Sequence, residues 1–229
     1  MVIGVLSVYN LFSLRAIGAQ VTGPAVSNTG SGKAAVDFYV MSYCPYGNMA
    51  EEGLAPVYNV LKNSVTFSPH YVIYDNYAGG GPDYCLDNGK YCSMHGIQEL
   101  NQDVRELCVD KYMGMDSYFK FVLAMNSQCS ASNADSCWEN VAKSLSLDVS
   151  KIKSCQSSEA TTLLKKEYDL GQQLGVQGSP TVFINSQSYQ GGRAPADFQK
   201  AICAVLNPKP AGCTAQLSGS AAVASGNCG

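Results

Sequence analysis

The strongest constraint on this chain of 229 residues is its cysteines: there are ten, and no two of them are separated by only two residues. Zinc ribbons and fingers need clustered Cys and His ligands, and the chain has no CxxC pair and only two histidines, His70 and His95. We therefore expect no metal site and no cofactor. Dispersed cysteines in such number are instead typical of disulfides formed in an oxidising, extracytoplasmic compartment.

The charge of the chain argues against one class of partner. Charged residues make up 14% of the sequence and the formal net charge is −3, whereas ordinary domains contain about 25% charged residues. Nucleic-acid-binding domains carry a basic surface, and nothing in this composition supplies one. We expect no nucleic-acid partner.

Both ends of the chain differ from its middle. Residues 1–14 form an apolar run that Arg15 ends, which is shorter than the roughly 20 residues needed to span a bilayer. Residues 1–19 are interpreted as a signal peptide or as the end of a membrane anchor, and either reading predicts export. Residues 20–33 are predicted to be a linker, and residues 214–229, small and polar, a flexible tail.

The middle of the chain, residues 34–213, alternates between strand and helix patterns. Strands are expected at 34–43, 65–74, 181–184 and 188–190, with a helix after the first that Gly53 and Pro56 interrupt and a last helix at 195–206. Residues from about 95 to 174 have helical periodicity, including a short helix at 148–155 and a longer one that Ser158 begins. The order predicts one α/β domain with a helical insertion.

Cys44 stands where the first strand ends and a helix begins. Backbone N–H groups and the positive end of the helix dipole meet there and stabilise a thiolate, and Pro45 suits the first helical turn because that position needs no N–H. Cys44 is therefore a candidate nucleophile for thiol–disulfide exchange. The alternative is a buried cysteine or half of a structural disulfide.

A second segment, Val176-Gln-Gly-Ser179-Pro180, enters a strand. Together with Cys44-Pro45-Tyr46-Gly47 it resembles the thioredoxin superfamily, in which a Cys-Pro-x-x segment opens a helix beside a cis-proline loop, and the long helical insertion resembles that of DsbA-like proteins. The resemblance implies a thioredoxin-like fold, an attacking thiol at Cys44, and a peptide groove lined by Ser179 and Pro180. Tyr46, beside the thiol, is expected to contribute to substrate binding.

A stretch of the insertion is similar to part of the signature of gamma-interferon-inducible lysosomal thiol reductases. The His-Gly pair at His95, Glu99 and Cys108 keep that family's spacing, and the sequence departs from it at Leu100 and Asp103. His95 is accordingly a candidate for a catalytic role near Cys44, with a structural helix-start histidine as the alternative.

Two departures from the superfamily concern the reaction. Gly47 stands where the resolving cysteine of a CxxC enzyme would be, so Cys44 is expected to act as a lone thiol that an external thiol or a distant cysteine releases. Cys228 on the predicted tail is such a cysteine. Asp37 lies seven residues before Cys44. The buried proton-transfer acid of the family lies six residues before its cysteine, on the opposite face of the strand. Asp37 is therefore expected to take that role only if a β-bulge shifts the strand by one residue.

The other cysteines are expected to form structural disulfides, although one sequence does not define their pairing. Nearness in the chain suggests Cys85–Cys92, Cys108–Cys129, Cys137–Cys155 and Cys203–Cys213, with Cys129–Cys137 as a competing choice.

These observations predict an exported thiol–disulfide oxidoreductase, secreted or membrane-anchored, that acts on the thiols or disulfides of extracytoplasmic proteins. The resemblance also suggests a membrane redox partner. The alternative is a non-catalytic thioredoxin-like module that binds peptides or client proteins. A lone active-site cysteine also helps to bind an iron–sulfur cluster in monothiol glutaredoxins, and an oxidising compartment argues against that role.

Overall fold

The computed structural model describes residues 33–219. The predicted signal or anchor at 1–19, nearly all of the predicted linker and residues 220–229, which include Cys228, lie outside the described residues.

A mixed four-stranded sheet forms the centre of the domain. Strands β1 (Ala34–Val40), β2 (Val65–Tyr71), β5 (Thr181–Ile184) and β6 (Gln187–Tyr189) lie in the order β2-β1-β5-β6, with β1 parallel to β2 and antiparallel to β5. Six of the seven β1 residues are buried. This explains why the strand is apolar at every position except Asp37 rather than alternating between apolar and polar residues.

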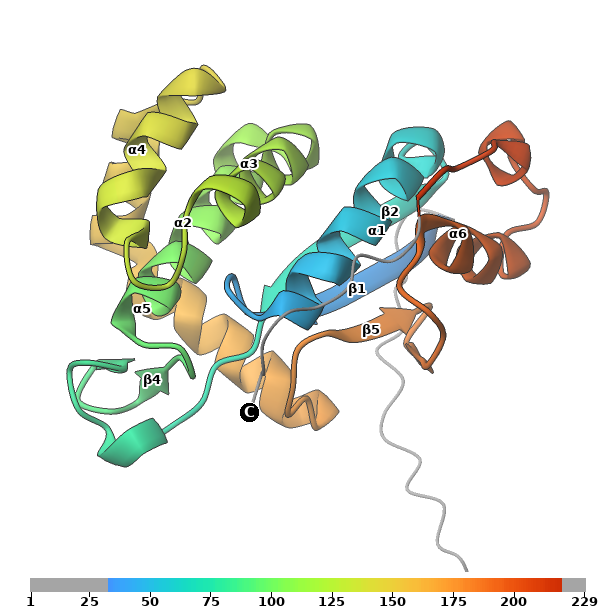
Figure 1. Ribbon diagram of the computed structural model, residues 1–229. Coiled ribbons are helices and arrows are strands. Elements are labelled where there is room, and N and C mark those ends of the chain that lie inside the picture. The colour runs from blue at the N-terminus through green and yellow to red at the C-terminus, as the bar shows by residue number, and fades with distance from the viewer. Residues whose placement is uncertain (1–32, 220–229) are drawn as a thin grey trace, which may run out of the picture.

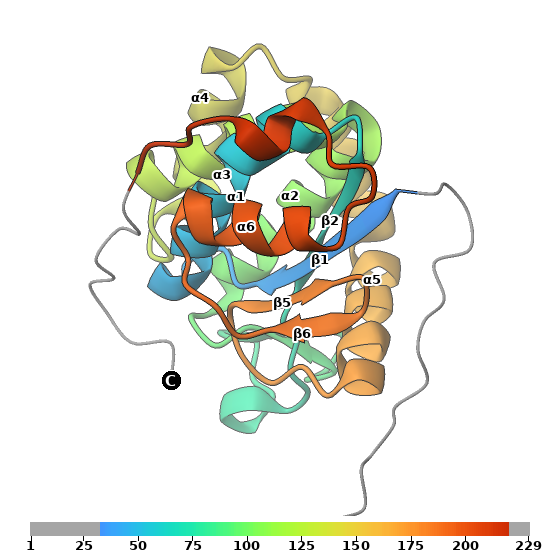
Figure 2. The same cartoon turned by 90° about the vertical axis from the view of Figure 1, so that its right-hand side faces the viewer.

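Helices α1 (Pro45–Leu61) and α6 (Pro195–Ala204) lie together on one side of the sheet (Figure 2). Gly53 and Pro56 were expected to kink or break this helix; a break is wrong, because α1 runs through both residues. Its apolar residues on both sides of the proline are buried, and their burial offsets one missing backbone bond. Gly53 instead permits close packing: a Cβ there would lie 2.2 Å from the carbonyl oxygen of Arg193.

Four helices between β4 and β5 form a separate bundle beside the sheet (Figure 1). They are α2 (Ile97–Met113), α3 (Met115–Gln128), α4 (Ala134–Ser144) and α5 (Val149–Leu174), in the stretch where the insertion is predicted. The expected division of α5 is wrong, because the Ser158 hydroxyl donates to the Ser154 carbonyl at 2.7 Å within one continuous helix. The N-cap is Asp148, whose carboxylate accepts the Lys151 N–H at 2.9 Å.

A small hairpin of β3 (Cys85–Leu86) and β4 (Tyr91–Cys92) follows the 3-10 turn η1 (Tyr77–Gly79). The Cys85–Cys92 disulfide joins residues that face each other across the two strands. Predicted as a loop, this stretch is therefore a cross-linked hairpin.

Four disulfides lie within the described residues. Two of them, Cys85–Cys92 and Cys203–Cys213, are among those expected. The expected pairs Cys108–Cys129 and Cys137–Cys155 are wrong: Cys108 bonds to Cys155 and Cys129 to Cys137.

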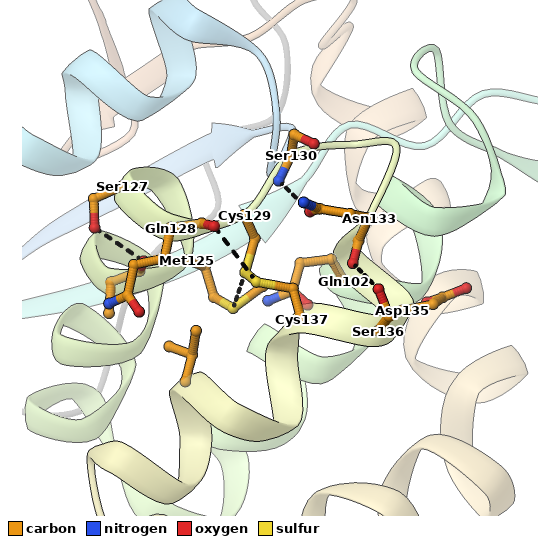
Figure 3. Close-up of a disulfide and its surroundings, with 12 residues drawn as sticks. Gln102, Met125, Ser127, Gln128, Cys129, Ser130, Asn133, Asp135, Ser136 and Cys137 are labelled. Carbon is orange, nitrogen blue, oxygen red and sulfur yellow. Dashed lines mark hydrogen bonds between the residues drawn. A yellow bond between two sulfur atoms is a disulfide. The ribbon is translucent and has the colours of Figure 1, made fainter.

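The physical reason for this correction is helix packing. Cys108 and Cys155 are buried on the neighbouring helices α2 and α5, whereas Cys129 and Cys137 lie on either side of the loop between α3 and α4 (Figure 3). The competing choice Cys129–Cys137 is the bond that forms.

The C-terminal segment packs on the domain through its main chain. The Gln199 side-chain amide donates to the carbonyls of Gly212 at 2.7 Å and Ala215 at 2.9 Å, near the 3-10 turn η2 (Ala211–Thr214). Leu217 packs against the core. The predicted tail thus begins as a packed segment, and its remainder lies outside the described residues. Over residues 33–219, no helix has the length and apolar character needed to cross a membrane.

Candidate functional site

Cys44 occupies the N-cap position of α1, with extended backbone angles and its N–H donated to the Met41 carbonyl at 3.1 Å. Its side chain is buried in a small apolar cluster with Tyr39, Met41, Val72 and Val176. The first turn of α1 presents its backbone N–H groups and the positive end of its dipole at this position, which favours a thiolate in the reduced protein.

The Ser179–Pro180 peptide bond is cis, and its loop lies against Cys44. The Ser179 carbonyl oxygen is 3.4 Å from the Cys44 Sγ atom. The Ser179 hydroxyl accepts the N–H of Met41 at 3.0 Å and so fixes this loop to the end of β1. The fold therefore brings together the two segments that carry the resemblance to the thioredoxin superfamily.

Gly47, at the position of a resolving cysteine, faces the same loop. A Cβ at Gly47 would lie 2.5 Å from the Ser179 Oγ atom and 3.3 Å from the Met41 carbonyl oxygen. The Ser179 hydroxyl therefore fills the space into which a second cysteine side chain would extend.

Tyr46 and Pro180 border the same surface. The Tyr46 side chain is exposed, and the Arg193 guanidinium lies 5.2 Å from its ring centre, a cation–π arrangement. Arg193 also lines a cavity of about 260 Å³ with Pro180, Tyr189 and Phe198. A surface with both aromatic and polar groups thus extends from the Cys44 helix to the cis-proline loop.

The loop before Cys44 is attached to helix α2 by buried acids. The Tyr43 N–H donates to Glu99 at 2.8 Å. The Ser42 N–H donates to Asp103 Oδ1 at 3.2 Å, and the Ser42 hydroxyl lies 2.6 Å from the same atom. His95 contacts Glu99 through its Nδ1 atom at 2.8 Å. The structure therefore connects His95 to the Cys44 loop through Glu99, and its catalytic role stays a prediction.

Asp37 lies in β1, on the strand face that also carries Tyr39 and Met41, and its carboxylate is 3.8 Å from the His70 Nε2 atom. On the other side of the ring, His70 Nδ1 is 2.8 Å from Glu167. Burial alone would lower the pKa of His70, but the two carboxylates outweigh it and raise the pKa to about 9. Asp37 thus has a histidine partner, and its proton-transfer role stays a prediction.

Sequence reasoning did not find the buried polar groups around the Cys44 loop, among them Ser42, Glu51, His70, Glu99, Asp103, Glu106 and Glu167. A signal existed for part of this set, because Glu99, Asp103 and Glu106 recur at spacings of four and three and so share one helix face. Over residues 33–219, no group of three or more His, Cys, Asp or Glu side chains is arranged to hold a metal ion.

Solved structures share this fold at low sequence identity. DsbA from Mycobacterium tuberculosis in its reduced form is 18% identical, with a TM-score of 0.56, and the match covers 85% of this chain and 93% of that one. DsbG from the same organism is 19% identical, with a TM-score of 0.57 and coverage of 85% and 88%. The domain therefore has the DsbA-like thioredoxin fold, as its sequence predicts.

Sequence relatives come from plants. Vacuolar-sorting receptor 1 of Pisum sativum is 26% identical over 167 residues, which are 60% of this chain and 27% of that protein. Vacuolar-sorting receptor 7 of Arabidopsis thaliana is 28% identical over 148 residues, 54% of this chain and 24% of that protein. The chain thus spans about a quarter of the length of these relatives.

A family model, the vacuolar sorting receptor thioredoxin-like domain, matches residues 54–203. This stretch includes the helical insertion and Ser179–Pro180 and begins ten residues after Cys44. The match covers more than half of the chain, so the chain belongs to the vacuolar sorting receptor thioredoxin-like domain family.

Proposed function

We propose that this domain is exported and exchanges thiols and disulfides with cysteines of other extracytoplasmic proteins through Cys44. The observation that carries the proposal is the placement of the Cys44 Sγ atom at the start of α1, 3.4 Å from the carbonyl of the cis-proline loop. A helix N-terminus activates the thiol, and the adjoining loop offers backbone groups to an extended peptide.

In the reducing direction, the Cys44 thiolate attacks one sulfur of a client disulfide. A Cys44–client disulfide forms and the other client sulfur leaves as a thiolate. A second thiolate then attacks Cys44, which releases the second client thiol and leaves Cys44 in a new disulfide. The client gains two electrons and the two thiols lose them; the reverse sequence oxidises a client dithiol.

Cys228 is our proposal for this second thiol, with an external thiol as the alternative. The four bonds described above use eight of the ten cysteines, and Cys44 and Cys228 are the two outside them. The last described residue, Gly219, lies against Pro195. Pro195 follows Arg193 by two residues, and the Arg193 guanidinium packs over the Tyr46 ring. Nine further residues reach at most about 30 Å, which is enough to bring a tail thiol to Cys44.

Peptide turnover tests the role of Cys44. Wild type and Cys44→Ser are compared in the reduction of a disulfide peptide and the oxidation of a dithiol peptide. We expect Cys44→Ser to lose both activities, and equal rates in the two proteins would overturn the proposal. Cys228→Ser is expected to accumulate the mixed disulfide when no external thiol is supplied; normal release there would assign resolution to another thiol.

Tyr46 gives a test of the peptide surface. Tyr46→Ala should slow capture of a client peptide severalfold and leave the reaction of Cys44 with a small disulfide unchanged, because only the peptide needs the aromatic surface. Tyr112→Ala is the matched control: Tyr46 and Tyr112 are similarly exposed, at 36% and 39%, and Tyr112 lies on α2, hydrogen-bonded to Glu159.

A client-binding module without turnover is the second candidate. Gly47 favours it, because the position of a resolving cysteine carries no thiol and the Ser179 hydroxyl occupies the adjoining space. Membership of a family named for sorting receptors also favours it. Clients that stay bound to Cys44 in the presence of excess small thiol would support it over the enzyme.

A further inference from the structure

Three carboxyl side chains, in addition to Glu99, are buried behind the Cys44 loop and lie where α1, α2 and α3 meet. Glu51 of α1 and Glu106 of α2 are each 1% exposed, and Asp103 of α2 is 0% exposed. Three isolated charges in such a place would be very costly. Their protonation therefore has to be read from their hydrogen bonds.

The three carboxyls are joined into one chain by three hydroxyl groups. Five consecutive contacts make up this chain. The Ser42 hydroxyl lies between two acids, 2.6 Å from Asp103 Oδ1 and 3.0 Å from Glu106 Oε2. The same Glu106 oxygen is 2.5 Å from the Tyr71 hydroxyl, which is 3.2 Å from the Tyr118 hydroxyl, and the Tyr118 hydroxyl is 3.0 Å from Glu51 Oε1.

A proton count decides how the chain is charged. Each contact needs one hydrogen between its two oxygens, and each hydroxyl supplies only one. Five contacts and three hydroxyls leave two hydrogens to be supplied by the carboxyls. Two of the three acids must therefore be protonated for every contact to be a hydrogen bond.

Glu106 is the acid that is best suited to stay ionised. Its carboxylate faces the hydroxyls of Ser42 and Tyr71 and also accepts from the Gln102 amide at 2.9 Å. Asp103 has the opposite surroundings, because its Oδ2 atom is buried with no hydrogen-bond partner, which an ionised carboxylate would tolerate poorly. Protons on Asp103 and Glu51 then complete all five contacts.

The pKa values follow the same order. Burial first, and then the charge of Glu99, raise the pKa of Asp103 well above its usual range, and burial with the charge of Glu106 does the same for the pKa of Glu51. Burial also raises the pKa of Glu106, but only to about 7, because hydrogen bonds from Tyr71, Gln102 and Ser42 stabilise its ionised form.

Other titratable groups surround the three acids from each neighbouring element. These groups either act on the three acids directly or act on a neighbour of the acids. They are Glu52 of α1, Tyr43 and His95 of the loops, Tyr71 of β2, Glu99 and Arg105 of α2, Tyr118 of α3 and Asp135 of α4. Arg105, the cation among them, is directed to Asp135.

We propose that Glu51, Asp103 and Glu106 share two protons and that this cluster positions the Cys44 loop. The mechanical link is Asp103, whose Oδ1 atom accepts the Ser42 N–H at 3.2 Å and contacts the Ser42 hydroxyl, two residues before Cys44. Loss of the Asp103 proton leaves the Ser42 hydroxyl with one hydrogen for two carboxylates, those of Asp103 and Glu106. One of these two contacts then has no hydrogen, and the loop loosens. Asp103 and Glu106 are positioning residues. The proposal rests on the proposed function only in taking Cys44 as the reacting residue.

Infrared spectroscopy of the whole domain tests the proton count, because a protonated carboxyl has its own C=O stretch. We expect the wild type to show that band at mildly alkaline pH. Its intensity should fall by about half in Asp103→Asn and in Glu51→Gln, and the band should persist in Glu106→Gln. Glu52→Gln, which removes an exposed neighbour of Glu51, is the matched control and should leave it unchanged. Absence of the band in the wild type, or an undiminished band in both of the first two variants, would overturn the count.

The positioning role is tested by the rate at which reduced Cys44 reacts with a small alkylating reagent, followed by mass spectrometry across a pH series. The wild type should show two steps, one for the thiol and one for the cluster. Asp103→Asn, which keeps a neutral donor to Ser42, should show the thiol step alone. Asp103→Ala, which removes both contacts to Ser42, should react at least about fivefold faster at acid pH, the factor expected for a single lost hydrogen bond. Identical profiles for the wild type and Asp103→Asn refute positioning.

The two failures can be told apart. If Cys44→Ser retains full peptide turnover, the proposed function fails while the infrared result stands. If the infrared band is absent, the cluster fails whatever the turnover shows.

Discussion

The Ser179 hydroxyl occupies the space next to Gly47: a Cβ at Gly47 would lie 2.5 Å from Ser179 Oγ, which itself accepts the Met41 N–H at 3.0 Å. The absent second cysteine and the serine before the cis-proline are therefore one structural arrangement. Restoring a CxxC motif means changing both positions.

Gly47→Cys alone is expected to destabilise the domain by about 1–2 kcal/mol, because Ser179 must turn away and leave the buried Met41 N–H unpaired. The introduced thiol should form a disulfide with Cys44 inefficiently. Adding Ser179→Ala should make room and raise the yield of that disulfide in mass spectrometry under mild oxidation. Equal yields in the single and double variants would show that Ser179 is no obstacle.

Gly53→Ala should destabilise the protein by about 2–4 kcal/mol, although alanine favours helices over glycine, because the new methyl group would lie 2.2 Å from the backbone oxygen of Arg193. Gly171→Ala in α5 is the control, since its Cβ meets nothing closer than Val176 at 4.0 Å. That variant should gain about 0.5–1 kcal/mol. Denaturant unfolding measures both, and the same sign in both variants would contradict this account.

His70 gives the domain a pH-dependent stability. Its pKa in the folded protein, about 9, lies above the value of about 6.5 in an unfolded chain, so the folded state binds its proton more tightly. The resulting stabilisation is complete below about pH 6.5 and disappears as pH rises to about 9, with a size on the order of 3 kcal/mol. Unfolding at a series of pH values should show this loss in the wild type and not in His70→Gln.

A matching slope in His70→Gln would assign the pH dependence to other groups. Asp37→Asn is the intermediate case: it removes the more distant of the two carboxylates and should reduce the loss without abolishing it.

The two disulfides of the helical insertion should differ in their contribution to stability. Cys108–Cys155 closes a loop of 47 residues and Cys129–Cys137 one of 8. In the chain-entropy description, removing the first costs about 4 kcal/mol and removing the second about 2.5 kcal/mol. Unfolding of the two Cys→Ala double variants measures the difference, and recovery of a Cys108–Cys129 peptide from the unreduced protein would contradict the pairing.

The α/β core could be predicted from the sequence, because strand patterns and a Cys-Pro helix start are local signals. The meeting of Cys44 with Ser179–Pro180 was implied by the resemblance to the thioredoxin superfamily and not by a local pattern. Its errors came from residues with two local readings. Ser158 resembles an N-cap, but inside a helix its hydroxyl bonds back to Ser154. Pro56 resembles a helix end, but buried neighbours on both sides hold the helix together.

The disulfide pairs and the carboxyl cluster were beyond local reasoning for a different reason. Cys108 and Cys155 meet only because α2 and α5 pack together, and Glu51 reaches Glu106 only through hydroxyls from β2 and α3. Each depends on long-range geometry, which a count of apolar residues along a helix does not contain.

The Gln199 amide holds the C-terminal segment by two carbonyl groups, those of Gly212 and Ala215, and the Cys203–Cys213 bond adds a covalent anchor. Carbonyls belong to the main chain, so these two hydrogen bonds do not depend on which side chains the segment carries. The side-chain requirements lie at Gly212, where a Cβ would meet the Val60 carbonyl oxygen at 2.2 Å, and at Leu217, which packs against the core. Exposed positions between them can therefore change without altering the course of the segment.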